Sequence, residues 1–535
     1  MHCVAFTRGR ACNRFAVHRV ITSISLCQCM KPSSDLFDLI RSLTKSEKRF
    51  FKLQSSLQSG DKNYIRVFDI IEKMTAYDED IVKKTFKGET FIKHLPSEKN
   101  HLYKLILKSL RSYYSETSIA SSLKQEIKNI EILYNKGLFA ECTKFLERSK
   151  KTAVRFEKFY YLFELISWEK TLLEESFENG QFGDLDSLIR EERSVLDKLE
   201  NLTAYHVLYS KINFVFRSGG YSRSAENTEI INEIEEHPLI KGKNTALSQR
   251  AATICYYTQG FCNVAKGNTE VALENYLKVK QILDSHTDLR ADLAKRYIRT
   301  LSQIIQCCLE LHQTDHAIDY LAQLKQLEEL DGFDTPDSIA RIQTEIILSN
   351  QKMYIYSANF KEGADAMSSV LSEVNIHESQ LNKEIALRMY YYAAYLHFGA
   401  GQYAKALQWL NKVINDNEND LRQDLYSYAR LFNIVVHYEL GNSDLLEYTI
   451  KSTSRFLQKR MRDFDIEKLI LDQFKKLIRL QRGNERRDQL LEFSEKLHEL
   501  AVHEECRALL RYFDFIGWTE SKLKETTLEE VLKKS

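Results

Sequence analysis

The residues best placed for chemistry are His498, Glu499 and His503. In a zinc-protease helix the two histidines stand four residues apart, so that both imidazoles face one metal ion. Here they stand five residues apart, a spacing that turns the second imidazole about 140° away around a helix. The two side chains cannot close on one zinc ion, and the pattern predicts no metal site.

Two further patterns also have simple interpretations. Arg217-Ser218-Gly219-Gly220 could cradle a phosphate, but no strand precedes it and no Gly-Lys-Thr follows it. The cysteines beyond residue 29 form no Cys-x-x-Cys pair and no zinc spacing, which favours small buried positions in a reduced, intracellular compartment. These are Cys142, Cys255, Cys262, Cys307, Cys308 and Cys506. We expect no enzyme, no cofactor and no metal.

The elements that would position binding residues are marked by a turn that recurs about every 43 residues. Glycine supplies the left-handed backbone that ends a helix, and Asn or Gln follows it in five units. A repeat of this length in a helix-forming sequence is typical of a helical-repeat solenoid. The marks are Gly137, Gly180, Gly219, Gly267, His312, Ala358, Gly401, Gly441 and Gly483.

Two later positions in the repeat unit also indicate a pair of helices. A small residue five positions on lets the second helix approach the first closely, and an apolar residue one turn later faces the same core. The small residues are Cys142, Ser224, Ala272, Ala317, Gly363 and Ala406. The apolar residues are Leu146, Ile189, Tyr276, Leu321, Met367, Leu410 and Ile450.

This pattern resembles the tetratricopeptide repeat (TPR), whose core is a Gly-x-Tyr turn followed by Ala-x-x-x-Phe. The unit from Tyr390 to Ile414 matches best, and the resemblance covers roughly Leu123 to Phe513. The period is longer than the usual repeat of about 34 residues, and the characteristic Trp and Pro are mostly absent. The chain is also similar to bacterial TPR proteins of the Bacteroidetes kind, which carry a small helical module before the repeats.

The resemblance implies an all-α fold, a right-handed superhelical solenoid of degenerate TPR-like helix pairs. It also implies that the first helix of each pair lines a concave face that binds a protein or peptide. Tyr and Arg are favoured anchors at such surfaces, although several of these residues could equally fill the core between repeats. The expected partner-binding residues are Tyr257, Phe261, Arg388, Tyr391, Tyr395, Phe398, Tyr428 and Tyr438.

Composition agrees with a helical protein. Only 4 prolines occur in 535 residues, and no alternating β pattern is found. No run of 18 apolar residues exists, so we expect no membrane insertion and a cytoplasmic protein. Residues 31–120 hold 17 basic and 12 acidic side chains, which places a mildly basic head before a mildly acidic repeat region.

The head contains its own helix signals. Thr44-Lys45-Ser46-Glu47 is a capping box that predicts a helix through Phe50, Phe51 and Leu53. Further helices are predicted over Asn63–Tyr77, Asp78–Phe86 and Ser97–Tyr114. In the last of these, Leu102, Leu105, Ile106 and Leu110 are expected to face a core.

The last of these helices also carries Lys99, Lys104, Lys108 and Arg111. After the connection Lys87-Gly88-Glu89, a basic helix could be the reader of a helix-turn-helix or winged-helix DNA-binding domain. The other interpretation is an ordinary solvated face on a bundle that caps the solenoid. Under the first interpretation, the chain would be a regulator whose head contacts nucleic acid and whose repeats sense a partner.

We therefore predict four regions. Residues 1–29, which are rich in Arg and Cys and lack acidic residues, form a disordered extension, either an over-extended start or a targeting segment. A helical module follows over 30–120, the TPR-like solenoid over 121–513 and a C-terminal tail over 514–535. The favoured function is a non-enzymatic scaffold for a protein or peptide partner.

Overall fold

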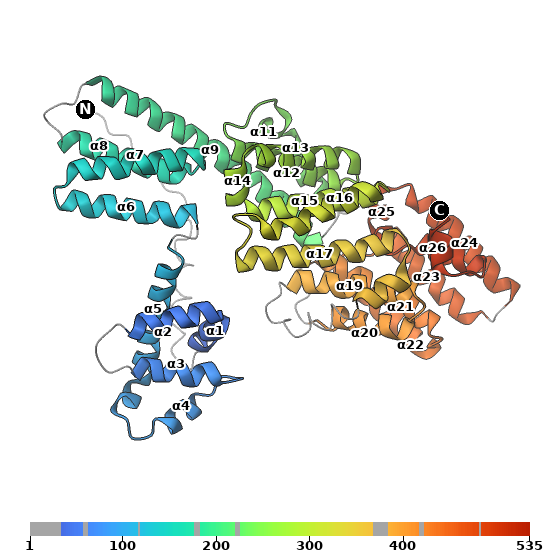
Figure 1. The fold of residues 1–535 in the computed structure, drawn as a ribbon. Helices are drawn as coiled ribbons and strands as arrows, with labels where there is room; N and C mark the ends of the chain where they lie inside the picture. Colours follow the sequence, from blue (N-terminus) through green and yellow to red (C-terminus); the bar gives the residue numbers. More distant parts are fainter. Residues whose placement is uncertain are drawn as a thin grey trace, which may run out of the picture. The chain divides into compact units, whose positions relative to one another are not determined.

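The computed structural model describes residues 34–56, 63–115, 118–175, 182–219, 225–367, 383–416, 422–480 and 483–534. These residues form helices and turns and contain no strand, which confirms the all-α class (Figure 1). Two compact units divide between Ser122 and Leu123, against a predicted boundary at 120. The extension predicted for residues 1–29 lies outside the described residues.

The first unit is a small helical module around one apolar core. Its centre is formed by Ile40, Phe68, Leu102 and Ile106, which are fully buried. Leu105 and Leu110 pack against the same core from its edge. The helices are α1 Asp35–Ser42, α2 Lys45–Ser56, α3 Asn63–Lys73, α4 Glu79–Thr85, the 3₁₀ helix η1 Thr90–His94 and α5 Leu95–Tyr113.

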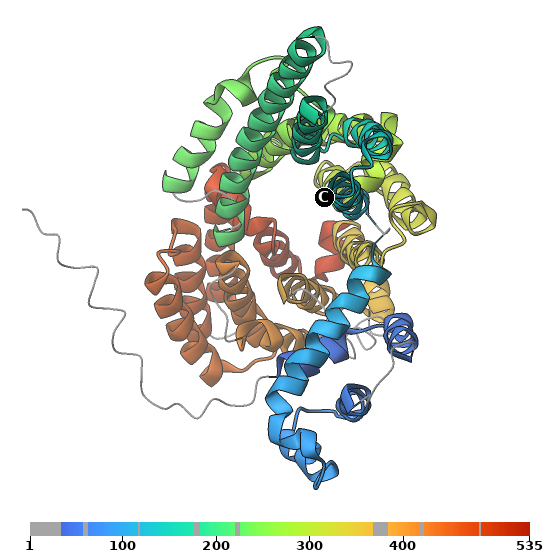
Figure 2. The same cartoon turned by 90° about the vertical axis from the view of Figure 1, so that its left-hand side faces the viewer.

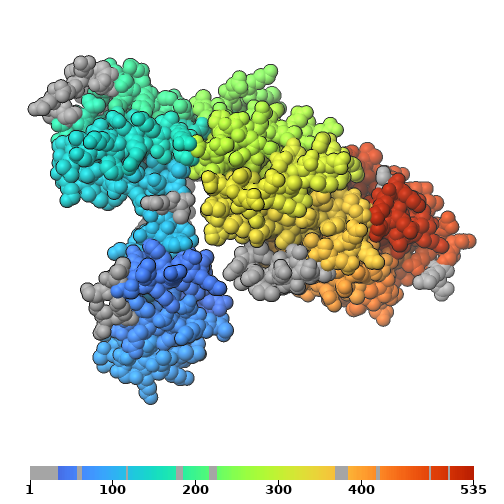
Figure 3. Space-filling model, viewed as in Figure 1, coloured from blue at the N-terminus to red at the C-terminus, as the bar shows by residue number. Residues whose placement is uncertain are grey.

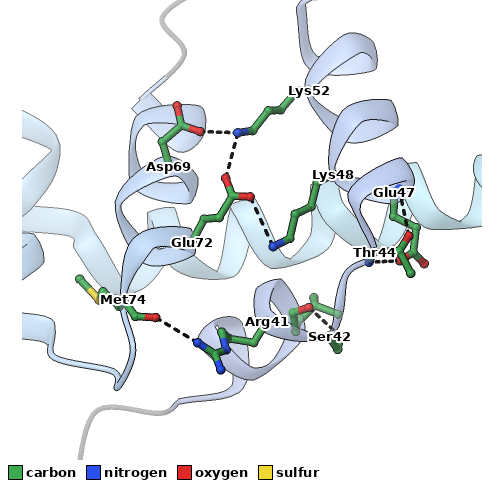
Figure 4. A network of polar contacts seen from close by, with 10 residues as sticks. Arg41, Ser42, Thr44, Glu47, Lys48, Lys52, Asp69, Glu72 and Met74 are labelled. Carbon is green, nitrogen blue, oxygen red and sulfur yellow. Dashed lines mark hydrogen bonds and ion pairs between the residues drawn. The ribbon is translucent and has the colours of Figure 1, made fainter. Parts of the chain in front are cut away.

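The predicted capping box is confirmed at the start of α2. The Thr44 amide donates to Glu47 Oε2 at 2.5 Å, and the Glu47 amide donates to Thr44 Oγ1 at 3.2 Å (Figure 4). Each side chain thus satisfies a backbone N–H that a helix start leaves open. The sequence did not reveal α1 or η1, and the helix predicted to reach Tyr77 ends at Lys73.

Ion pairs join α2 to α3 in this unit. Lys52 contacts Asp69 at 2.8 Å and Glu72 at 2.9 Å, while Lys48 reaches Glu72 at 3.3 Å (Figure 4). Burial alone raises the pKa of Glu72, but the two lysines outweigh it and lower that pKa. The network lies at the edge of the core and links α2 to α3, while both helices pack mainly on α5.

The second unit is a succession of helices, each packed on its neighbours in sequence, and Figure 2 shows them following a curved path. Its first half contains α6 Ile119–Asn135, α7 Phe139–Arg155, α8 Phe159–Glu175, α9 Phe182–Gly219, α10 Ala225–Glu236, α11 Pro238–Lys241, α12 Gln249–Ala265, α13 Thr269–Ser285, α14 Thr287–Asp292, α15 Ala294–Glu310, α16 Thr314–Gln326 and the 3₁₀ helix η2 Leu327–Glu329. Its second half contains α17 Pro336–Tyr356, a helix over 360–367, α19 Lys383–Gly399, α20 Tyr403–Ile414, α21 Gln423–Glu439, α22 Ser443–Lys459, α23 Asp465–Arg479, α24 Asn484–Ala501, α25 Glu504–Leu510, α26 Phe515–Leu523 and α27 Leu528–Leu532.

Most of the predicted turn residues have the expected backbone. Gly137, Gly267, Gly401 and Gly441 have φ between 71° and 79°, and His312 and Ala358 share this left-handed conformation at 57° and 52°. After each of them, the next amide donates to the carbonyl five residues earlier, as Gln402 does to His397 at 2.8 Å. This is the Schellman hydrogen bond that satisfies the last carbonyls of a helix.

The packing expected after each turn is also present. The small residues Cys142, Ala272, Ala317 and Ala406 are fully buried between paired helices. The apolar residues one turn later are buried as well, with one exception. Ile189 is 36 % exposed, and its neighbour Leu188 is buried instead, so the prediction at this position was wrong by one residue.

Two segments differ from the predicted plan. Residues 182–219, where the spacing predicts two helices, form the single continuous helix α9, and Gly180 lies outside the described residues. Residues 514–535, for which the sequence predicts a tail, contain α26 and α27 with Phe515 and Trp518 buried. In Figure 3 these residues, drawn in red, lie against the helices drawn in orange. Residues 514–534 belong to the core of the second unit, because their apolar side chains pack on the apolar surface of the preceding helices.

Candidate binding pocket

The residues predicted to bind a partner do not form an open surface. Tyr391, Tyr395, Phe398 and Tyr428 are buried in one core cluster, and Tyr438 is half-buried at its edge. Tyr257 and Phe261, on α12, are buried among other aromatic rings and apolar side chains of the second unit. At these positions the burial agrees with the alternative interpretation, in which the rings fill the core between repeats. Large rings on closely packed helices gain more from mutual burial than from contact with water.

Residues near the C-terminal end of the same chain cover α19 and α21. Tyr512 lies 4.4 Å from Tyr428 and 5.9 Å from Tyr391 between ring centroids. Phe513 lies 5.1 Å from Tyr395 and 5.3 Å from Phe398. We refer to residues 504–534, which supply these rings, as the closing segment. It occupies the face on which the sequence places a partner.

A buried ion pair holds the closing segment in place. The Arg422 guanidinium donates to both carboxylate oxygens of Asp424, at 3.0 and 2.9 Å, and to the Tyr512 hydroxyl at 2.7 Å. That hydroxyl donates in turn to Asp424 Oδ2 at 2.8 Å. Burial alone raises the pKa of Asp424, but the adjacent Arg422 outweighs burial and lowers this pKa to about 2.

A pocket of about 510 Å³ remains open beside this covered face. Its walls come from α15, α17, α19 and the closing segment. Arg388, which the sequence predicts as a binding residue, lines this pocket together with the buried Tyr395. Further lining side chains are Gln306, Lys352, Tyr392 and Arg511. The volume falls in the range of small-ligand sites, which is about 300–1,000 Å³.

Two half-buried cations dominate this pocket. Lys352 Nζ donates to the side-chain carbonyl of Gln306 and lies 5.6 Å from the centre of the Tyr392 ring. In the part of the chain that the structure describes, neither Lys352 nor Arg388 has a carboxylate oxygen within 4.0 Å. Burial and the charge of Arg388 together lower the pKa of Lys352. The lining also contains Arg422, Arg507 and Arg511 against the carboxylates of Glu310, Glu384 and Asp514, so five basic side chains face three acidic ones and the pocket keeps an excess of two positive charges.

The pKa of Tyr392 responds to the same positive charges. Burial raises the pKa of its neighbours Tyr391 and Tyr395 on α19. Burial also acts to raise the pKa of Tyr392, but the charges of Lys352, Arg388 and Arg422 outweigh it and lower this pKa. Three tyrosines on one helix thus differ because only one of them faces the cations.

A smaller polar cavity of about 40 Å³ adjoins the pocket and shares Gln306, Lys352 and Arg388 with it. Arg299 and Glu345 complete its charged lining. The Ser302 hydroxyl also lines it and has no hydrogen-bond partner among the residues that the structure describes. A cavity of this size and polarity fits a single water molecule. Its polar side chains, several of them from α15, extend the hydrogen-bonding groups of the larger pocket.

Sequence reasoning found Arg388 but missed Lys352 and Tyr392. A signal for Lys352 did exist, because no acidic residue stands three or four positions from it on either side. A lysine on a helix surface usually has such a neighbour as a partner or faces water. Tyr392 carries no such signal, since its role depends on cations from two different helices.

The cations predicted for the alternative nucleic-acid function separate into two groups. Lys104, Lys108 and Arg111 are exposed on α5. Lys99 is mostly buried, and its ammonium group contacts Glu79 at 2.7 Å and the Tyr77 hydroxyl at 2.8 Å. The Lys99 hydrogen bond lowers the pKa of Glu79 to about 2. Lys99 is thus a structural residue of the module, which leaves three candidates.

No protein-family model matches the chain, and no curated protein matches it. Among the described residues, no helix combines the length and the apolar character needed to cross a membrane.

Proposed function

We propose that the chain is a non-enzymatic scaffold that holds a segment of a protein partner in the pocket lined by α15, α17 and α19. One observation carries this proposal: an open pocket of about 510 Å³ whose half-buried cations, Lys352 and Arg388, have no carboxylate oxygen within 4.0 Å among the described residues. Burying a charge without a partner costs free energy. A protein that only needed a stable core would be more stable with apolar residues there.

The arrangement of the helices supports the same proposal. We propose that the helix pairs form a right-handed TPR-like superhelix, in which α15, α17 and α19 are first helices that face inward. The left-handed turns at His312, Ala358 and Gly401 end these three helices in the same way. Equivalent helices thus bring Gln306, Lys352 and Arg388 to one pocket.

The closing segment indicates how a partner could bind. It places aromatic rings on α19 and α21 and adds hydrogen bonds such as that from the Asp514 amide to the Tyr395 hydroxyl, at 3.2 Å. A partner segment would use the same combination of ring contact and polar anchor in the pocket beside it. Tyr356, Ile355 and Leu510 supply the apolar part of that lining.

Site-specific photo-crosslinking tests the proposal. A photoreactive phenylalanine analogue replaces Tyr356, which lines the pocket, in the full chain expressed in its own cells. The matched control carries the same analogue at Tyr448, which is 73 % exposed on α22. We expect a defined protein adduct from position 356 that is absent at 448 and survives nuclease treatment. Equal adducts at both positions, or none at either, would contradict a pocket-bound protein partner.

The three exposed cations on α5 favour a second candidate function, a regulator whose module contacts nucleic acid. Lys104, Lys108 and Arg111 follow one another at spacings of four and three residues, which places them on one helix face. Phosphate contacts make binding salt-dependent. If this function holds, replacing all three by Gln abolishes salt-sensitive binding of a fluorescent DNA duplex by the full chain. Replacing the surface lysine Lys451 leaves it unchanged.

A further inference from the structure

The positive charge of the pocket indicates the chemical class of the ligand that it binds. Lys352 extends from α17 and Arg388 from α19, and both line the large pocket as well as the small cavity beside it. Gln306 holds Lys352 through its carbonyl oxygen and donates its amide to Glu310. The ammonium group is thus positioned by a neutral group, which leaves its charge available to a ligand.

The hydrogen-bonding capacity of the two cations matches a phosphate group. An ammonium group has three donors and a guanidinium group has five. Gln306 accepts from Lys352 and the Tyr392 oxygen accepts from Arg388, so most of these donors are available to a ligand. A carboxylate brings one negative charge, whereas a phosphate monoester brings about 1.5 to 2 at neutral pH, with three acceptor oxygens. The excess of two positive charges in the lining is therefore balanced by one phosphate monoester but only half balanced by one carboxylate.

The size and the remaining lining of the pocket indicate that the phosphate carries an organic group. A pocket of about 510 Å³ is several times larger than a single phosphate. Beyond the cations, the side chains of Ile355, Tyr356 and Leu510 line the wall. These apolar and aromatic side chains would contact carbon atoms attached to the ester oxygen.

We propose that this pocket binds a phosphate monoester, with the phosphoryl group between Lys352 and Arg388 and its organic substituent against Ile355, Tyr356 and Leu510. The inference rests on the proposed function in taking the pocket as a binding site. The phosphate is carried either by a phosphorylated side chain of the partner or by a small molecule, since both present the same group to the two cations.

Calorimetric titration of the full chain in phosphate-free buffer tests this chemistry. The probes are inorganic phosphate, O-phosphoserine, a phosphoserine peptide and its unphosphorylated form, with sodium acetate at equal ionic strength as the anion control. We expect phosphate and O-phosphoserine to bind and acetate not to bind. A phosphopeptide that binds tighter than O-phosphoserine identifies a partner side chain as the source, whereas equal affinities identify a small molecule.

Three variants locate the site. Lys352→Gln and Arg388→Gln should each weaken phosphate binding by at least about tenfold, the effect of losing one charge-assisted hydrogen bond. The matched control is Arg430→Gln, which removes a half-buried arginine on α21 that lies over Phe456, 4.3 Å from its ring centre, and does not line the pocket. Weakening by the control to the same extent, or binding of acetate as tightly as phosphate, would overturn the proposal.

A second measurement separates a binding role from a structural one. Without ligand, Lys352→Met should leave Tm unchanged or raise it, because it removes a charge that lacks a carboxylate partner. A Tm that falls as far as it does for loss of a buried ion pair would mean that Lys352 is structural. Phosphate binding without a protein adduct at Tyr356 would refute only the scaffold. An adduct without phosphate binding would refute only this inference.

Discussion

Arg422 shows how much one residue can hold in place. It adopts a left-handed backbone, at φ 53°, directly before α21, and its guanidinium joins Asp424, Glu384 and Tyr512. A non-glycine residue in this conformation costs roughly 1–2 kcal/mol. The strain persists because the side chain neutralises a carboxylate that is 0 % exposed.

Arg422→Gln should destabilise the chain strongly, because it leaves the charge of Asp424 buried without its partner. Breaking a buried pair in this way costs about 3–5 kcal/mol. Urea unfolding followed by circular dichroism measures the loss. Lys451→Gln, which breaks an exposed pair with Glu447 on α22, serves as the control and should produce no measurable change. Equal effects of the two variants would show that the Arg422 network does not stabilise the fold.

Buried histidines should make the fold sensitive to mild acid. Burial lowers the pKa of His397 and His437 below 6.5, although the Gln402 hydrogen bond opposes this at His397. The unfolded chain therefore binds more protons than the folded chain at pH values just below 6.5. Their contribution to stability is present above pH 6.5 and is lost as the pH falls through the folded pKa.

The free energy of unfolding should therefore fall between pH 7.5 and 5.5, with each histidine contributing a slope of at most about 1.4 kcal/mol per pH unit. His397→Gln keeps a hydrogen-bonding side chain but cannot titrate, so its loss over this range should be smaller. His498→Gln, at a residue that is 57 % exposed, is the matched control. A wild-type stability that is flat over this range would contradict the prediction.

At the scale of the element, the turns between helices carry most of the information in the sequence. Glycine marked them at Gly137, Gly267, Gly401 and Gly441 because a left-handed residue is required there. The same conformation occurs at Glu157, between α7 and α8, and at Met461, between α22 and α23. These turns have no glycine and, unlike those at His312 and Ala358, do not fall on the recurring spacing, so nothing in the sequence distinguished them.

A pair of substitutions tests the turn argument. Gly401→Ala should destabilise the fold by about 1 kcal/mol, because a Cβ at φ 74° is strained even though it would meet nothing within 4 Å. Met461→Gly should stabilise it by a few tenths to about 1 kcal/mol, because the side chain is 85 % exposed and only the strain is removed. Thermal unfolding of both variants, with Gly88→Ala as a further left-handed glycine in the first unit, measures the effect. Changes of the same sign at 401 and 461 would contradict the argument.

Helix boundaries were predictable where a local signal exists and not elsewhere. The capping box at Thr44 fixed the start of α2, and Asp78 marked the start of α4 by accepting from the Asp80 amide. The continuous helix α9 was not predictable, because its length depends on what packs along it rather than on a start or stop residue. The same reasoning explains why α1, with little local signal, was missed.

At the scale of the whole molecule, the closing segment changes which surface is available. Inward-facing aromatic residues were identifiable from the repeat pattern, but their cover was not. Tyr391 and Tyr512 are 121 residues apart in the sequence, and no local rule relates positions so distant. The pocket likewise depends on Lys352 and Arg388 meeting across two helices, which only the folded chain shows.

Removing residues 504–535 should expose the rings of Tyr395, Phe398 and Tyr428 and make α19 to α23 susceptible to proteolysis. Trp518 also leaves, and with it the hydrogen bond to Glu439 at 2.6 Å. Binding of an apolar dye and limited proteolysis followed by mass spectrometry measure the change. In the full chain, Phe513→Ala should cost about 3–5 kcal/mol, whereas Phe139→Ala, at a partly exposed ring, should cost much less. A truncated chain as protease-resistant as the full chain would contradict this account.

The closing segment also sets an order of events during synthesis. Helices α19 and α21 leave the ribosome well before Tyr512 and Phe513 are made, so their aromatic faces are uncovered during that interval. The ion pair at Arg422 and Asp424 has no Tyr512 hydroxyl to complete it during that interval. A chain that stops before residue 512 would display the rings of Tyr395 and Phe398 uncovered. The cell could therefore tell a finished chain from an unfinished one by whether this face is covered.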